Sequence, residues 1–201
     1  PEALWPARER LAKFFNAPPE SITFTANVTA GVNTIASGLK LDPGRDIIVN
    51  DQEYGAMVYA WERAVQRASA AVRTIDLPIG PQFTRQGLLD RFDAALDRRA
   101  QLLFLSHITT ATGLILPLRE ICAMARARGV LTMIDGAHAP GMIPLDIRSL
   151  GCDFYAGNGH KWLLAPAGSG FLYIRPGLED RVEPLIVSWG WKYDRAAAHH
   201  R

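Results

Sequence analysis

The sequence predicts an α/β fold: a mostly parallel seven-stranded sheet with helices on both faces. Short apolar segments alternate along the chain with segments whose apolar residues recur at helical spacing, which is the order typical of a parallel sheet. One predicted strand, 101–107, contains a continuous apolar run, as expected of a strand that helices cover on both sides.

The first elements follow from local patterns. Apolar residues at helical spacing predict a helix over 3–15, which ends near the prolines at 18–19. Alternating apolar and polar residues predict a short strand at 21–25. A polar turn at 26–33 then leads into a second helix.

The later elements continue the alternation. Apolar runs bounded by turn residues predict six further strands, at 46–50, 71–77, 101–107, 130–134, 152–156 and 171–174. Helical spacing predicts three further helices, one leading from 51–56 to about residue 67, one over 87–96 and one over 118–128.

The composition restricts the class of protein. The 201 residues are 48% hydrophobic and 21% charged, which is typical of one soluble globular domain. The formal net charge of +2 gives no reason to expect nucleic acid or an anionic membrane as a partner. The chain contains no apolar run near the roughly 18 residues of a membrane span and opens with no secretory signal pattern. We therefore expect a cytoplasmic protein.

The two cysteines, Cys122 and Cys152, have neither metal-like nor redox spacing. Their apolar surroundings predict buried free thiols in a reducing compartment. No metal site is expected.

A turn that contains Asn27 and Thr29 precedes the second predicted helix. Free backbone N–H groups at the positive end of a helix dipole bind anions. The same turn residues also suit an ordinary N-cap, so the pattern alone leaves both interpretations open.

Lys161 lies between a glycine-rich turn at 157–159 and the apolar run at 162–165. Partial desolvation disfavours the charged form of a lysine, and a neutral amine forms a Schiff base with an aldehyde. Asp135 ends an apolar strand 26 residues earlier, and His138 follows three residues later. Each residue alone fits an ordinary surface or turn position. A lysine for an imine and an aspartate for a pyridinium nitrogen are together what pyridoxal phosphate requires.

Other polar residues follow the ends of the predicted strands, where open α/β sheets bind ligands. The group comprises Asn27 to Thr29, Tyr54, His107, Asp135, His138 and Lys161. No G-x-G-x-x-G motif opens a first strand–helix turn, which argues against a dinucleotide site.

At these residues the sequence resembles the class V branch of the fold-type-I pyridoxal-phosphate enzymes. Within that branch it is most similar to isopenicillin-N-epimerase-like proteins, which are relatives of the cysteine desulfurases. The resemblance rests on five motifs, at 27–33, 51–56, 135–141, 157–162 and 188–191. It implies the cofactor-binding large domain of this fold.

The resemblance also implies residue roles. Lys161 would form the Schiff base and move the proton at the substrate α-carbon. Asp135 would keep the pyridinium nitrogen protonated, and His138 would contact the phenolic oxygen of the ring. Tyr54 would stack on the ring, and His107 would lie near the cofactor.

The phosphate would be held at the start of the second helix. The implied groups are the backbone N–H groups of Val28 and Thr29 and the side chains of Asn158 and His160. Asn27, in the same turn, is implied as a further cofactor-binding residue. Desulfurases carry an asparagine where this chain has Thr110, so the resemblance gives Thr110 no role.

Family chains are about twice as long. The resemblance implies a large domain over 1–188 that lacks an N-terminal segment, and a connection over 189–201 to an absent C-terminal small domain. In the family that domain supplies an arginine for the substrate carboxylate and, in desulfurases, the catalytic cysteine. A small amino-acid substrate and a homodimer are implied.

The reaction at the α-carbon stays open: epimerisation, β-elimination by a C–S lyase, cysteine desulfuration or transamination. Epimerisation needs a second proton-transfer group, for which Tyr54 is the candidate. A non-catalytic paralogue or truncated domain is the alternative to an enzyme.

Overall fold

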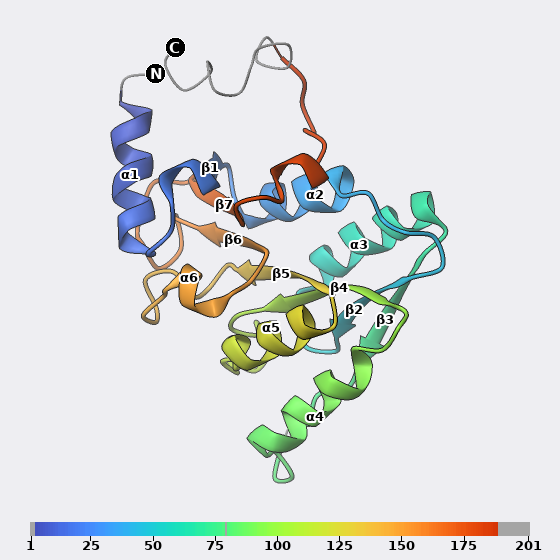
Figure 1. Ribbon diagram of the computed structural model, residues 1–201. Helices are drawn as coiled ribbons and strands as arrows, with labels where there is room; N and C mark the ends of the chain where they lie inside the picture. The colour runs from blue at the N-terminus through green and yellow to red at the C-terminus, as the bar shows by residue number, and fades with distance from the viewer. Residues whose placement is uncertain (1–2, 79, 189–201) are drawn as a thin grey trace.

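The computed structural model describes residues 3–78 and 80–188 (Figure 1). The connection expected at 189–201 lies outside the described residues. Within them, one sheet has the strand order β1-β7-β6-β5-β4-β2-β3. Its strands are β1 (Ile22–Thr25), β2 (Asp46–Asn50), β3 (Ala71–Ile75), β4 (Ala100–Ser106), β5 (Leu131–Gly136), β6 (Phe154–Asn158) and β7 (Gly170–Ile174).

The sheet is mostly parallel, as the sequence predicts. The four pairs from β3 to β6 across the middle of the sheet are all parallel. Strand β7 runs antiparallel to both of its neighbours, β6 and β1. Six strands therefore end at one common edge, and the residues that follow them are brought together.

Helices cover both faces of this sheet (Figure 1). The α-helices are α1 (Leu4–Phe14), α2 (Val28–Gly38), α3 (Gly55–Ala68), α4 (Arg85–Ala95), α5 (Leu118–Ala127) and α6 (Ile147–Leu150). Two short 3-10 helices, η1 (Pro19–Ser21) and η2 (Glu179–Arg181), were not predicted, and neither was α6.

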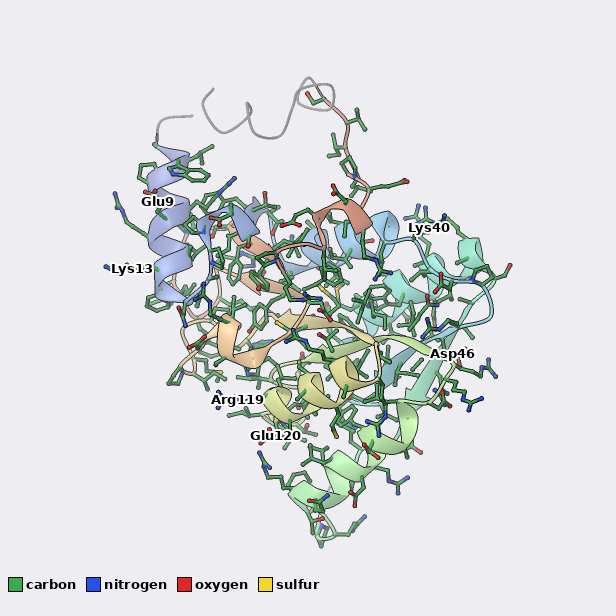
Figure 2. The ribbon with its side chains drawn as sticks, viewed as in Figure 1. Glu9, Lys13, Lys40, Asp46, Arg119 and Glu120 are labelled. Atoms are coloured by element: carbon green, nitrogen blue, oxygen red, sulfur yellow. The ribbon has the colours of Figure 1, made fainter. Side chains whose placement is uncertain are left out.

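Two hydrophobic cores lie on opposite sides of the sheet. Helices α2 and α3 pack on one face, and α1, α4, α5 and α6 pack on the other. Neighbouring strand residues alternate between the cores: Ile47 belongs to the α2–α3 side and Ile48 to the other. Each such fully buried side chain contributes roughly 1.5–3 kcal/mol. Charged residues such as Lys13 of α1 and Arg119 of α5 project outward (Figure 2).

Two strand boundaries differ from the prediction near the site. Strand β5 continues one residue past Asp135, the predicted strand end, because Asp135 pairs in register with Ser106 of β4 and Gly136 pairs with Gly157 of β6. Strand β6 begins at Phe154 instead of 152. Asp153 lies outside the strand, where its carboxylate accepts hydrogen bonds from the backbone and hydroxyl of Thr132.

Candidate active site

A cavity of about 280 Å³ lies at the carboxyl ends of the parallel strands. It is lined by Asn27, Val28, Thr29, Tyr54, Met57, Thr110, Asp135, Ala137, His138, Asn158, His160 and Lys161. Nine of the ten site residues expected from the sequence are therefore brought to one place. The tenth, His107, is not part of this lining.

The Lys161 side chain is half-buried and meets His138. Its Nζ atom lies 3.2 Å from His138 Nε2. The indole Nε1–H of Trp162 donates to His138 Nδ1, also at 3.2 Å. The apolar run after Lys161 does not cover the amine, because Trp162 is 48% and Leu164 86% exposed. The partial burial of Lys161 comes from the cavity.

Asp135 is buried within β5. The backbone N–H of Ala137 donates to its Oδ1 at 2.8 Å, which holds the carboxyl group in place. Burial raises the pKa of Asp135 to about 6, while this hydrogen bond and the positive charge of Lys161 oppose the rise. A carboxylate in such a position suits a cationic partner in the cavity.

His138 follows β5 and is half-buried. Burial lowers its pKa below the usual value, and the nearby charge of Lys161 lowers it further. The imidazole is therefore neutral near pH 7, with one nitrogen protonated and the other free to accept.

The start of α2 forms one wall of the cavity. Asn27 is its N-cap and accepts from the backbone N–H of Ala30 at 2.8 Å, so the N-cap interpretation is confirmed. The backbone N–H of Val28 donates to Asn158 Oδ1 at 2.9 Å. The N–H of Thr29, in the first turn, has no partner within the helix.

Asn158 ends β6 and is buried. Since its Oδ1 accepts from Val28, its NH₂ group points elsewhere. Among the described residues, nothing accepts a hydrogen bond from that group. An unpartnered amide donor beside a helix N-terminus fits an anionic ligand group.

Two further predicted residues occupy the rim. His160 lies next to Lys161, and its Nδ1 donates to the carbonyl oxygen of Ser169 at 2.9 Å, which leaves Nε2 for a ligand. Tyr54 precedes α3 and is 51% exposed, so its ring is accessible for stacking.

His107 lies just after β4, and its side chain is buried on the α1–α5 side of the sheet rather than in the cavity. Its Nδ1 lies 3.0 Å from the hydroxyl of Tyr155 in β6. Burial lowers the pKa of His107 to about 4, so the ring is neutral. Its backbone N–H donates to the carbonyl oxygen of Asp135 at 2.8 Å. These two contacts join the end of β4 to β6 and to Asp135 of β5.

Sequence reasoning missed Glu53. Its carboxylate accepts from the backbone N–H of Ser106 at 2.9 Å, from the Ser106 hydroxyl and from the amide of Asn50. The pKa of Glu53 is raised to about 8: burial is the main cause and the charge of Asp135 adds to it, while the hydrogen bonds from Ser106 and Asn50 oppose the rise. One sequence feature could have indicated Glu53: it follows the end of a predicted strand and directly precedes Tyr54.

Other chemistries find little support in the described part of the chain. Cys122 and Cys152 are buried free thiols, as predicted. Burial raises the pKa of Cys122 to about 12 and raises that of Cys152 well above its ordinary value, so neither is a nucleophile near pH 7. Over residues 3–78 and 80–188, no group of three or more metal-binding side chains is found. No helix in the same ranges could cross a bilayer.

Comparison with known proteins places the chain in a family. The family model described as "Aminotransferase class-V" matches residues 2–193. Isopenicillin N epimerases of Amycolatopsis lactamdurans and Streptomyces clavuligerus are each 46% identical over 96% of this chain. A probable cysteine desulfurase of Methanothermobacter thermautotrophicus is 33% identical over 94% of it. These matches cover only 49%, 48% and 46% of the relatives, so the chain spans about half their length.

Solved structures of pyridoxal-phosphate enzymes are also similar to this chain. A complex of the cystine C–S lyase C-DES with its product cysteine persulfide has a TM-score of 0.85 at 32% identity, covering 94% of this chain and 50% of that one. A lysine-to-alanine mutant of C-DES, with glycine covalently linked to its pyridoxal phosphate cofactor, gives 0.85 at 31%, covering 94% and 49%. The sequence motifs, the sheet with its cavity and these similarities agree: the chain belongs to the class V aminotransferase family.

Proposed function

We propose that this chain carries pyridoxal phosphate on Lys161 and acts at the α-carbon of a small amino acid, as an epimerase or C–S lyase of the isopenicillin-N-epimerase type. The observation that carries the proposal is the convergence of Lys161, His138 and Asp135 on one cavity beside a helix N-terminus. The higher identity to the epimerases, 46% against 33% for the desulfurase, supports the epimerase branch.

The cavity residues fit this cofactor. The Thr29 N–H at the start of α2 and the unpartnered NH₂ group of Asn158 suit the phosphate, and His160 Nε2 is a further candidate. Asp135 suits the ring nitrogen: with a pKa of about 6 it is largely ionised at pH 7. A protonated nitrogen beside it would stabilise the carboxylate further.

When bound, pyridoxal phosphate supplies an electron sink that stabilises negative charge at the substrate α-carbon. Lys161 would hold the cofactor and would move the proton at that carbon as a general base and acid. Asp135 would keep the ring nitrogen protonated, His138 would contact the phenolic oxygen, and Tyr54 would stack on the ring face.

The reaction depends on what serves the second face of the α-carbon. Epimerisation needs proton exchange on both faces, and Lys161 serves one of them. Tyr54 lines the cavity from the start of α3 and is the candidate for the other. Elimination with C–S cleavage needs only Lys161 and a leaving group, so both reactions belong to the proposal.

Cysteine desulfuration is the second candidate, since solved relatives of this fold are named as desulfurases or as a C–S lyase. It would require a nucleophilic cysteine from outside the described residues, because Cys122 and Cys152 are buried and held as thiols. Transamination within the family is a further alternative. A non-catalytic paralogue would have no use for Lys161, Asp135 and His138 in one cavity.

We also propose that residues 1–188 form the large domain of a longer cytoplasmic protein that acts as a homodimer. In this proposal 189–201 lead to a small domain that binds the substrate carboxylate. Apolar side chains at the end of the described chain support further protein contacts there: Ile186 is 81% and Val187 61% exposed.

Product analysis tests the reaction. The full-length protein, loaded with pyridoxal phosphate, is incubated with single enantiomers of small amino acids, and the products are separated by chiral chromatography. An inverted amino acid identifies an epimerase, pyruvate with ammonia a lyase, and a keto acid alone a transaminase. Lys161→Ala should abolish each product. Wild-type turnover in Lys161→Ala would contradict the role of this lysine.

A further inference from the structure

We propose that Trp162 is a positioning residue: its indole N–H fixes the tautomer of His138 and thereby directs the Nε2–H donor of the ring at the Lys161 amine. This inference rests on the proposed function for the role of Lys161. Trp162 was predicted as part of an apolar run and of the motif at 157–162, and neither a role for its indole N–H nor its contact with His138 was expected.

The three side chains form a short hydrogen-bonded chain. Trp162 Nε1–H donates to His138 Nδ1 at 3.2 Å. On the other side of the ring, His138 Nε2 lies 3.2 Å from Lys161 Nζ. Because the two contacts use the two nitrogens of one imidazole, the proton position at Nδ1 decides what Nε2 can do.

The direction of these bonds follows from the donor inventory. An indole nitrogen is a donor and never an acceptor, so His138 Nδ1 accepts and carries no proton. The neutral ring then bears its proton on Nε2, which becomes a donor toward Lys161. An ammonium group offers three donors and no acceptor. The contact is therefore favourable only when Lys161 Nζ is an unprotonated amine with a free lone pair.

The surrounding groups suit this arrangement. Burial lowers the pKa of His138, which keeps the ring neutral, as the tautomer requires. Asp135 and Lys161 line the same cavity as His138.

The position of Trp162 permits a clean substitution. Its side chain is 48% exposed and is not part of either hydrophobic core. Trp162→Phe keeps an aromatic side chain and removes the N–H group. Leu164→Ala is the matched control, since Leu164 lies in the same loop and is 86% exposed.

The first readout is the tautomer itself, measured without cofactor. Nitrogen-15 NMR of histidine-labelled protein, with His138 assigned through His138→Gln, should show an unprotonated Nδ1 and a protonated Nε2 in the wild type and in Leu164→Ala. In Trp162→Phe the Nδ1-protonated tautomer should become populated. A wild-type spectrum with a protonated Nδ1, or an unchanged tautomer in Trp162→Phe, would overturn the proposal.

The second readout is the rate at which pyridoxal phosphate attaches to Lys161 at about pH 7.5. Loss of one hydrogen bond of ordinary strength shifts an equilibrium about fivefold, so attachment should be about fivefold slower in Trp162→Phe and unchanged in Leu164→Ala. Equal rates in all three proteins would also overturn the proposal. If no protein attaches the cofactor, the proposed function fails, while the tautomer measurement still decides the role of Trp162.

Discussion

Replacing Glu53 by glutamine should remove a pH-dependent loss of stability from this fold. The Glu53 carboxyl accepts hydrogen bonds from Ser106 and Asn50 and has a pKa of about 8 against an ordinary 4.5. Because the folded-state pKa is raised, the folded form keeps a proton that the unfolded chain releases. Stability is therefore complete below about pH 4.5 and is lost as the pH rises through about 8.

The size of the effect follows from the two pKa values. A shift of one pKa unit corresponds to about 1.4 kcal/mol. Between about pH 5 and about pH 8.5, ionisation of Glu53 should lower the free energy of unfolding by up to about 4 kcal/mol. Asp135 and His107 also have shifted pKa values. The difference between Glu53→Gln and the wild type reports Glu53 together with its coupling to Asp135, since the other groups are present in both proteins.

Urea denaturation of the cofactor-free protein at the two pH values measures this difference. Near pH 5 the variant and the wild type should have similar stability, because a protonated carboxyl and an amide have similar shapes. Near pH 8.5 Glu53→Gln should be the more stable by several kcal/mol. Glu62→Gln, at an exposed site on α3, controls for loss of one surface charge. A Glu53→Gln difference that is the same at both pH values would refute the reasoning.

Three further predictions concern the sheet beneath the site and the cofactor. Gly136→Ala should destabilise the fold by about 3 kcal/mol or more in thermal melts, because its Cβ would overlap the Tyr155 ring. Gly55→Ala is the control: a Cβ at Gly55 meets open space, so this variant should be as stable as the wild type or more stable. Tyr155→Phe should cost about 1–3 kcal/mol in denaturant melts, because buried His107 loses its partner; no loss would contradict that bond. Asp135→Ala should lower turnover of the loaded full-length enzyme about a hundredfold or more while cofactor content, measured by absorbance, falls much less; normal turnover would exclude its role.

The fold could be predicted because the apolar runs and helical spacings that indicate its strands and helices lie within short segments of the sequence. The apolar runs that became β4 and β5 needed no knowledge of their partners, and the common strand edge follows from parallel order. Asp135 and Lys161 could therefore be assigned to one site from the sequence. The boundaries of β5 and β6 were less accurate, since pairing with Ser106 and the Asp153 hydrogen bonds are properties of the assembled sheet.

Side-chain direction and contacts across loops were not predictable. The resemblance implies that His107 lies near the cofactor, and its place at a strand end does not fix which face of the sheet its side chain takes. It packs against Tyr155 instead of lining the cavity. The contacts of Glu53 with Ser106 and of Trp162 with His138 join residues 53 and 24 positions apart. These contacts depend on the paths of the loops, which the spacing of apolar residues does not determine.

The central claim is that Lys161 carries pyridoxal phosphate. The most direct test is to add the cofactor to the full-length protein, record the visible absorbance, reduce with borohydride and map the labelled peptide. The sequence has four lysines, Lys13, Lys40, Lys161 and Lys192, so the mapping is decisive. We predict an imine band that reduction fixes on Lys161. No band, or a label on one of the other three lysines, would contradict the account.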